Sequence, residues 1–214
     1  MVWSDKDNII PSNAFDGLHP TVVRVFCPDH KKYFNITYVR NYHLTSSESD
    51  LSTYSKTYNE IERPWIHLIT NNTILLMNKG AHYKPIASYA SQLNETFRNC
   101  IIEKKLVVFK DTHYGVIDYK SLFSSPPSRP NYPNFTSVQL NWGWNRFEEE
   151  NILTKDLIRN SFNWVIYMNI SGSTSYRSDS RRHGLHFCIP GTVDSWVMKF
   201  LEIVHIYNLK LKGL

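Results

Sequence analysis

The side chains with the most chemical capability gather in residues 181–196, which read RRHGLHFCIPGTVDSW. His183 and His186 stand three residues apart, and Cys188 follows two residues after the second histidine. A histidine on such a loop could act as the general base for a serine nucleophile. It could also ligate a metal ion, or be hydrogen-bonded in the core as part of a structural loop. From these residues alone, the structural interpretation is the default.

A zinc site here would use His183, His186 and Cys188, with His82 or His113 as a fourth ligand. Structural zinc sites normally draw their ligands from two clear pairs, such as Cys-x-x-Cys with His-x-x-x-His. The second pair is missing from this sequence. We therefore expect no metal site and no cofactor.

A second stretch, Asn78–Tyr83, reads NKGAHY and directly follows an apolar run. Gly80 would let the backbone turn freely, and Asn78 carries an amide donor. Together with nearby backbone N–H groups, this amide could bind an oxyanion. An ordinary turn from a strand to a helix is the alternative, and it is favoured for this hexamer taken alone.

Five short apolar runs predict the strands that position these stretches, because runs of this length are typical of strands buried on both faces of a sheet. They are Thr21–Phe26, Phe34–Val39, Thr73–Asn78, Leu106–Phe109 and Trp164–Met168. Helical periodicity alternates with them, beginning at Pro85, over Phe147–Arg159, and from about Asp194 to Tyr207. Alternating strands and helices predict an α/β fold with a mainly parallel sheet, whose ligands lie at the carboxyl ends of the strands.

Two polar connectors interrupt this pattern, Ser46–Tyr58 and the Pro- and Ser-rich Leu122–Pro133. We expect neither to separate domains, because elements on both sides are needed to complete one sheet. The 214 residues are therefore expected to form a single domain, 1–214.

The last block, from His186 through Pro190-Gly191 to Asp194 and Trp196, resembles the C-terminal signature of the PC-esterase family. This SGNH/GDSL-like family includes the plant trichome-birefringence-like polysaccharide O-acetyltransferases, and its version reads His-Trp-Cys-Leu-Pro-Gly-x-x-Asp-x-Trp. The resemblance implies a three-layer SGNH-hydrolase-like sandwich. It also implies acyl transfer to or from carbohydrate hydroxyls, with acetyl as the expected group and an acyl donor that the sequence does not identify.

Weaker blocks occur in the family's order. Asn78–Tyr83 is similar to its Asn-x-Gly-x-His-aromatic block, Leu106–His113 to the strand and loop that follow, and Tyr176–Asp179 to its Arg-x-Asp segment. By this resemblance, His186 would be the catalytic base. Asp179 is our candidate for the carboxylate that orients it. Asn78, Gly80 and His82 would line the oxyanion or substrate site.

The chain departs from the family at the nucleophile, because Gly-Asp-Ser occurs nowhere in it. Ser4 has no preceding strand, and Ser180 and Ser195 fall at the wrong end of the domain. The family's orienting Asp, three residues before the catalytic histidine, is replaced by His183. Asp179 lies seven residues before His186, and a loop could bring it back.

Two explanations fit these departures. The chain could be a fragment that lacks its first strand and nucleophile block, or a degenerate member of the family, or both. We expect an inactive protein in either case. The alternative function is non-catalytic carbohydrate binding or scaffolding, in which Tyr83, Trp142 and Trp144 could stack on sugars or could equally be core residues.

The charge and the apolar runs of the sequence indicate which partners and which cellular compartment to expect. The formal charge of +5 comes from scattered basic residues, so no nucleic-acid partner is expected. No apolar run is long enough to span a membrane, and the start does not resemble a signal peptide. Taken alone this indicates the cytosol, and any membrane attachment would need a segment that this chain lacks.

Other features favour the secretory pathway, in the Golgi lumen or outside the cell. Five Asn-X-Ser/Thr sequons begin at Asn35, Asn71, Asn94, Asn134 and Asn169. The three cysteines, Cys27, Cys100 and Cys188, leave one without an internal partner in an oxidising compartment. We expect Cys188 to be structural, in a disulfide that fixes its loop.

Overall fold

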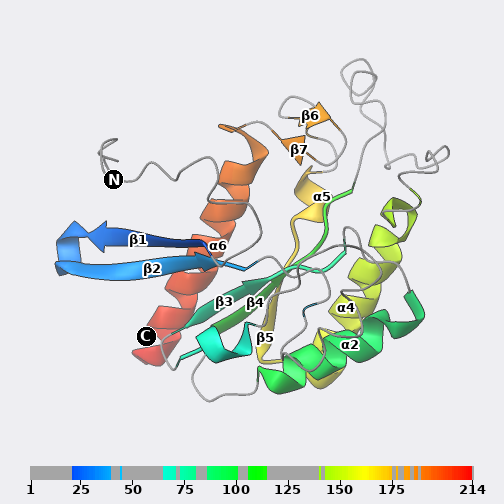
Figure 1. Ribbon diagram of the computed structural model, residues 1–214, viewed down its shortest axis with the longest axis horizontal. Coiled ribbons are helices and arrows are strands. Elements are labelled where there is room, and N and C mark those ends of the chain that lie inside the picture. Colours follow the sequence, from blue (N-terminus) through cyan, green and yellow to red (C-terminus); the bar gives the residue numbers. More distant parts are fainter. Residues whose placement is uncertain are drawn as a thin grey trace. The chain divides into compact units, whose positions relative to one another are not determined.

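The computed structural model describes residues 21–39, 44, 65–70, 73–80, 86–100, 106–114, 140, 143–174, 177, 181–183, 186–187 and 189–213. The chain divides into two compact units, Met1–Leu68 and Ile69–Leu214. Figure 1 labels the α-helices and β-strands of both units. Within the part of the chain that the structure describes, no helix is both long and apolar enough to cross a membrane.

The first unit contains a two-stranded antiparallel ribbon and the short 3-10 helix η3 (Ile66–Leu68). Strands β1 (Thr21–Cys27) and β2 (Lys32–Tyr38) are joined through the 3-10 turn η1 (Pro28–His30). We expected these two runs in a mainly parallel sheet, but they pair with each other instead. Their connection is too short for a parallel crossover, which takes about a dozen residues.

The second unit is built on a parallel sheet in the order β3-β4-β5. The strands are β3 (Ile74–Met77), β4 (Leu106–Lys110) and β5 (Val165–Met168). Central β4 is buried over Leu106–Phe109, as the apolar run LVVF predicted, because neighbouring strands and helices cover both its edges and both its faces. The predicted α/β class with parallel strands is confirmed for this unit.

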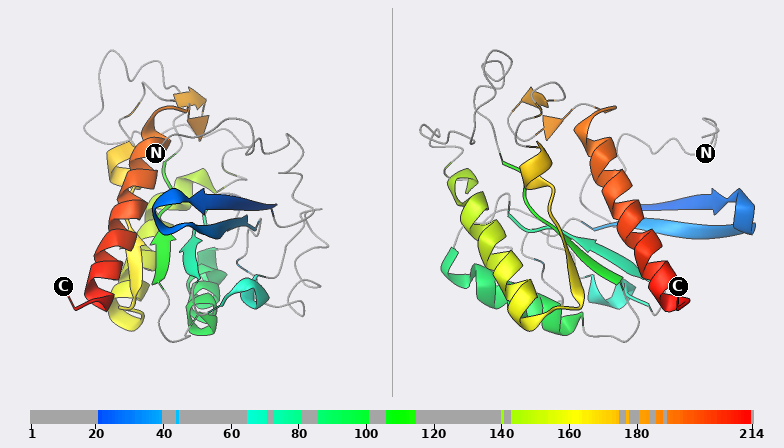
Figure 2. Two further views of the ribbon diagram at one scale, coloured as in Figure 1. Left: turned by 90° about the vertical axis from the view of Figure 1, so that its left-hand side faces the viewer. Right: turned by 180° about the vertical axis from the view of Figure 1, so that it is seen from behind.

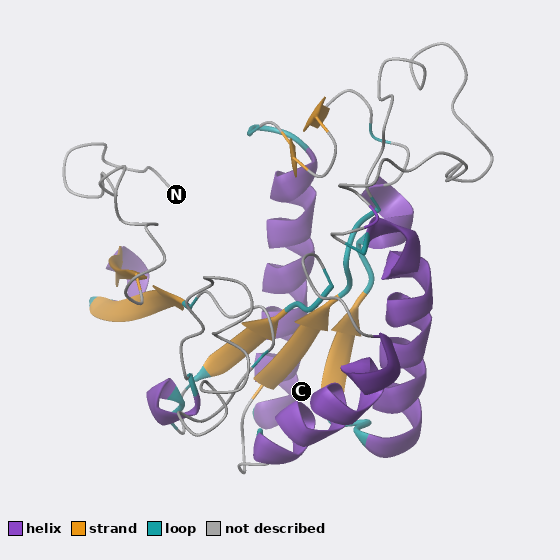
Figure 3. Cartoon of the chain, turned by 45° about the vertical axis from the view of Figure 1, so that its right-hand side comes forward, coloured by secondary structure: helices purple, strands orange, loops and turns teal. Residues whose placement is uncertain are grey.

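Helices α2 (Ile86–Asn99) and α4 (Phe147–Ser161) cover one face of this sheet, as Figure 3 shows. Tyr89, Leu93 and Phe97 recur every four residues along α2 and are fully buried. The Phe97 ring lies 5.8 Å from the ring of Phe109 on β4. The predicted apolar stripe of α2 therefore forms the core on this side.

Helix α6 (Thr192–Leu211) covers the opposite face (Figure 2). Leu106, Val108, Met168 and Ile170 pack there against the stripe predicted for this helix, which includes Trp196, Phe200, Val204 and Tyr207. The helix begins two residues before Asp194, whose carboxylate accepts a hydrogen bond from the Gly191 N–H at 2.6 Å. This contact satisfies a backbone donor at the helix start.

Three short elements lie beyond the carboxyl ends of the sheet strands, where Figures 1 and 2 show them close together. They are α5 (Ser171–Thr174) and the two paired strands β6 (Arg181–His183) and β7 (His186–Phe187). The 3-10 turn η5 (Trp144–Arg146) leads into α4. The residues that resemble the family's last block therefore belong to the carboxyl edge of the sheet.

Candidate functional site

The turn after β3 lies against the segment after β4. A Cβ atom on Gly80 would lie only 2.1 Å from the Thr112 hydroxyl oxygen, far inside van der Waals contact. Glycine is therefore required by close packing between these two segments. We expected Gly80 to provide conformational freedom, and the structure gives space as the physical reason.

The Asn78 side chain joins the same two segments. Its amide nitrogen donates to the Lys110 carbonyl at 2.9 Å and to the Thr112 hydroxyl at 3.1 Å. An amide nitrogen carries two hydrogens, so both are used by acceptors within the chain. In this arrangement Asn78 positions the turn, and an oxyanion role for its side chain would require one of these bonds to open.

Asn151 on α4 holds the segment after β4 from the other side. Its amide oxygen accepts the Thr112 N–H at 2.9 Å, and its amide nitrogen donates to the Thr112 carbonyl at 2.8 Å. The side chain thus pairs with the backbone of Thr112 as a neighbouring strand would. This bidentate contact continues backbone pairing beyond the end of β4, where the sheet has stopped.

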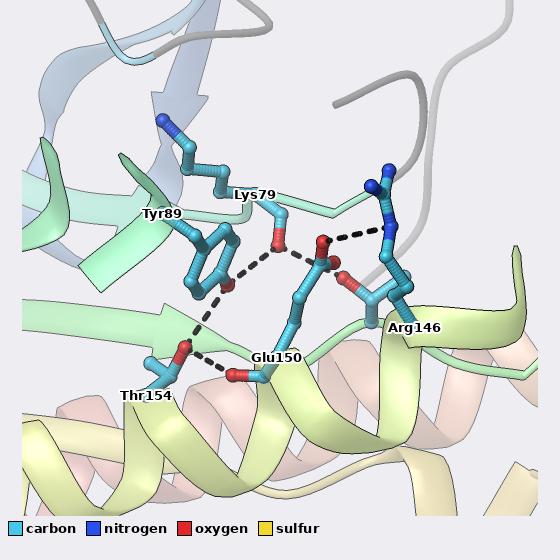
Figure 4. A network of polar contacts seen from close by, with 6 residues as sticks. Lys79, Tyr89, Arg146, Glu150 and Thr154 are labelled. Carbon is cyan, nitrogen blue, oxygen red and sulfur yellow. Dashed lines mark hydrogen bonds and ion pairs between the residues drawn. The ribbon is translucent and has the colours of Figure 1, made fainter. Parts of the chain in front are cut away.

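The carbonyl of Lys79 is the centre of a third set of bonds, shown in Figure 4. It accepts from the Thr112 hydroxyl at 3.0 Å and lies 3.1 Å from the Tyr89 hydroxyl. Tyr89 also lies 2.9 Å from the hydroxyl of Thr154. Tyr89 has one proton and can serve only one of these acceptors at a time. The backbone of the β3 turn is thereby fixed to α2, α4 and the end of β4.

Glu150 lies beside this network and is fully buried. Its carboxyl oxygens have no hydrogen-bond partner among the described residues, and the Arg146 Nε lies 4.0 Å away (Figure 4). Burial raises the pKa of Glu150 to about 8, and the charges of Arg146 and Lys79 only partly offset this. The raised pKa therefore favours the protonated carboxyl group at neutral pH, which avoids the cost of burying an isolated charge.

Asp111, at the end of β4, binds the segment after β5. Its carboxylate accepts from the backbone N–H of Ile170 at 2.8 Å, from that of Ser171 at 3.0 Å, and from the Ser171 hydroxyl at 2.6 Å. Only 1% of Asp111 is exposed. These bonds satisfy the first N–H groups of α5, so Asp111 connects two strand ends. Burial beside this carboxylate also raises the pKa of Tyr167.

Lys110 projects toward the α6 face. Its ammonium lies 5.1 Å from the centre of the Trp196 ring and donates to the Asp111 carbonyl at 3.1 Å. Burial lowers the pKa of Lys110 to about 8, with partial compensation from the Asp111 charge. No sequence pattern singles out this lysine, because a single charged residue at a strand end is common.

The block of residues 186–196 contacts the carboxyl edge of the sheet through a cluster of three rings. The Phe187 ring lies 5.0 Å from His113 and 5.3 Å from Trp196, and His113 lies 5.1 Å from Trp196. His113 follows β4, so β7 is anchored beside the strand ends. His186, the neighbour of Phe187, is exposed. Successive side chains of a strand point to opposite faces, which places His186 on the face turned away from this cluster.

The residues predicted for the site fall into three groups. Asn78, Gly80 and His186 all belong to the segments at this edge of the sheet. His82, Asp179, Cys188, Tyr83 and Trp142 lie outside the described residues. Trp144 is only 6% exposed and is a core residue, so it cannot stack on a sugar.

Two serines near this edge are bonded within the chain. The Ser171 hydroxyl is bonded to Asp111, and the Ser195 hydroxyl donates to the Thr192 carbonyl at 2.6 Å. Both hydroxyls are therefore engaged by groups within the chain.

Of the residues considered as zinc ligands, Cys188 lies outside the described residues. Among the described side chains, no group of three or more His, Cys, Asp or Glu residues is arranged to hold a metal ion. The backbone of His183 pairs with that of His186 in the β6–β7 ribbon. Cys27 and Cys100 are both present as thiols.

Sequence reasoning missed Asp111, Thr112 and Asn151. The first two could have been found by the rule that selected Asn78, because they also follow a buried strand directly. Asn151 lies within a helix, and nothing in its local sequence indicates its partner, 39 residues away. Comparison with protein-family models, with curated proteins and with solved structures found no match to this chain.

Proposed function

We propose that this chain is an SGNH-type acyl-transfer domain, with the three-layer sandwich of that group, whose catalytic activity is silent. The proposed ligand is a carbohydrate of the secretory pathway, and the ancestral reaction is acyl transfer at its hydroxyl groups. The supporting observation is the packing of Phe187 and Trp196 on His113. It brings the block that most resembles the family to the strand ends where Asn78 and Gly80 also lie.

The chemistry of an active domain of this kind explains why this chain is expected to be silent. A serine would attack the acyl carbon, and His186 would take the serine proton. This chain has no Gly-Asp-Ser, and the hydroxyls of Ser171 and Ser195 are bonded elsewhere. Loss of a triad serine typically lowers the rate about a million-fold. What such a domain can retain is the binding of its substrate.

A direct test incubates the purified chain with nitrophenyl acetate and with a fluorophosphonate probe. We expect hydrolysis at the rate of buffer alone and no covalent labelling. Turnover that a single Ser→Ala change abolishes would show that the chain has a nucleophile and would overturn the silent assignment.

The binding test uses calorimetric titration with acetylated and deacetylated oligosaccharides. We expect His186→Ala to abolish binding and His205→Ala to leave it unchanged, because His205 is also exposed but lies on α6. A preference for the acetylated ligand would support an acyl-transfer ancestry, and equal binding would favour the second candidate, a carbohydrate-binding or scaffolding protein. No binding to either ligand would contradict both.

A further inference from the structure

The exposed face of the β1–β2 ribbon carries an unusual group of side chains. Arg24 is directly opposite Asn35 in the register, and Phe26 is directly opposite Tyr33. Because side chains alternate along a strand, these four lie on the same face. The Arg24 guanidinium lies 4.2 Å from the centre of the Tyr33 ring, and the Phe26 ring lies 4.9 Å from it.

This face is also hollowed beside Asn35. This hollow is shallow and open to solvent, and Arg24, Tyr33, Phe34 and Asn35 line it. Tyr33 is 59% exposed and Phe26 47%, so aromatic surface is open to solvent next to a cationic donor. Aromatic surface beside hydrogen-bond donors suits a sugar ring, which offers C–H groups on its faces and oxygens around its edge.

Asn35, Ile36 and Thr37 form an Asn-X-Thr sequon within β2. All three residues are exposed and extended. Tyr33 precedes the asparagine by two residues, which is the spacing that puts both side chains on one face of a strand. A sugar attached to the Asn35 amide would therefore emerge beside the Tyr33 ring and opposite Arg24.

Two other sequons can be compared in the structure, and both are folded into the second unit. In the sequon at Asn169, Ile170 is fully buried and the Ser171 hydroxyl is bonded to Asp111. The sequon at Asn94 lies inside helix α2, and its Thr96 is 3% exposed. The sequons at Asn71 and Asn134 lie outside the described residues.

We propose that Asn35 is an N-glycosylation site whose first N-acetylglucosamine occupies the hollow beside Tyr33 and Arg24. This rests on the secretory localisation in the proposed function. The donor is an oligosaccharide linked to a lipid diphosphate. The Asn35 amide nitrogen forms a bond to C1 of the sugar, the bond from C1 to the phosphate oxygen breaks, the amide loses one proton, and the lipid diphosphate leaves. No oxidant or reductant takes part.

The test expresses the full chain behind a cleavable leader that directs it to the endoplasmic reticulum of a eukaryotic host. A reporter sequon in the tag shows that each molecule reached the lumen. Peptide N-glycosidase treatment in heavy-oxygen water, followed by peptide mass mapping, then identifies each occupied asparagine. All of the protein in the lumen is analysed, so that a variant that is not secreted from the endoplasmic reticulum is still included.

We expect occupancy at Asn35 and its complete loss in Asn35→Gln and in Thr37→Ala, which keeps the asparagine. Asn94→Gln and Asn169→Gln should leave the glycan pattern unchanged. An unmodified Asn35 in molecules whose reporter sequon is glycosylated would overturn the proposal. If the leader-directed protein is modified at Asn35 but the protein in its own cells is not, the site stands and the localisation in the proposed function fails.

The melting temperature tests the proposed contact between the first sugar and the Tyr33 ring. An endoglycosidase trims the glycan to a single N-acetylglucosamine, and the melting temperature is compared with that of the fully deglycosylated protein. We expect the single sugar to raise the melting temperature by a few degrees in the wild type and in Tyr33→Phe, and to have no effect in Tyr33→Ala. An equal rise in all three proteins would overturn the placement of the sugar on this ring.

Discussion

The segments after β3 and β4 and the short strand β7 lie at the same edge of the sheet, but the fold holds them very differently. Asn78, Asp111 and Thr112 use their side chains to bind neighbouring backbone, and the two residues after β4 are almost fully buried. β7 is two residues long, and its Phe187 packs in a cluster of rings with His113 and Trp196. His186 beside it is exposed.

This difference separates residues that satisfy backbone groups from residues that are open to a ligand, and the sequence alone does not distinguish the two. The polar residues at the strand ends satisfy backbone groups where the sheet stops, which any parallel sheet must achieve in some way. His186 is exposed at this edge, whereas the side chains of Asn78 and Asp111 are bonded to neighbouring backbone. A ligand-binding role is therefore more reasonable for His186 than for Asn78 or Asp111.

The largest effect that would test this comparison is expected from Asp111→Ala. The change leaves the buried N–H groups of Ile170 and Ser171 without their acceptor, and we expect a loss of about 3–5 kcal/mol in the free energy of unfolding. Asp156→Ala on the exposed face of α4 is the matched control and should change stability by less than about 0.5 kcal/mol. Urea denaturation measures both. Similar values for the two variants would remove the structural role given to Asp111.

Glu150 gives a pH-dependent form of the same test. Its pKa is raised from 4.5 to about 8 in the folded protein, so the folded state keeps a proton that the unfolded chain releases above pH 4.5. The stability that this group contributes is therefore present at low pH and is lost as pH rises to about 8, by about 2–4 kcal/mol in all. The glutamine in Glu150→Gln cannot ionise, so this variant should lack the part of the pH dependence of unfolding free energy that comes from Glu150.

The measurement is the difference in unfolding free energy between wild type and Glu150→Gln at several values from pH 4.5 to 8. The series ends at pH 8 because the pKa of Lys110 is lowered to about 8. Above that pH, Lys110 makes the unfolding free energy rise with pH, which is opposite in sign to the effect of Glu150. Glu149→Gln, one residue away and exposed, is the control and should run parallel to the wild type. A parallel curve for Glu150→Gln as well would mean that Glu150 is ionised in the folded protein.

Much of the second unit could be predicted because its signals are local. The runs TILLMN, LVVF and WVIYM become β3, β4 and β5 within two residues at each end, and the stripes of α2 and α6 face the sheet as their periodicity indicated. Buried strands and amphipathic helices each carry their pattern in a few consecutive residues. The antiparallel pairing of β1 with β2 also has a local signal, because the short connection that contains Pro28 and Asp29 leaves no room for a parallel crossover.

The candidate site was less predictable because its bonds join distant parts of the chain. Asn151 pairs with Thr112 across 39 residues, and Asp111 reaches Ser171 across 60. No local pattern marks either partner. Gly80 was selected for the conformational freedom of glycine, whereas its actual constraint is the position of Thr112, which depends on the register of β3 and β4.

Gly80→Ala tests this last constraint. The new Cβ would lie 2.1 Å from the Thr112 hydroxyl, so the turn must move away from β4, and we expect a loss of about 2–3 kcal/mol. Gly172→Ala is the matched control, because its Cβ would meet only the Asn169 side-chain oxygen, at 3.7 Å. That change lies in α5 and should be neutral or stabilising by about 0.5 kcal/mol. Thermal denaturation of both variants decides the point, and equal melting temperatures would show that the turn is not closely packed.

The smallest effect on stability is expected from His186→Ala. Phe187→Ala, at the adjacent residue of β7, is the variant to compare with it. Phe187→Ala removes a ring from the cluster with His113 and Trp196 and should cost about 1.5–3 kcal/mol. His186→Ala removes an exposed side chain and should change the unfolding free energy by less than about 0.5 kcal/mol. A large loss in His186→Ala would mean that this histidine is structural. A small loss, together with the loss of oligosaccharide binding, would separate function from packing at two adjacent residues of one strand.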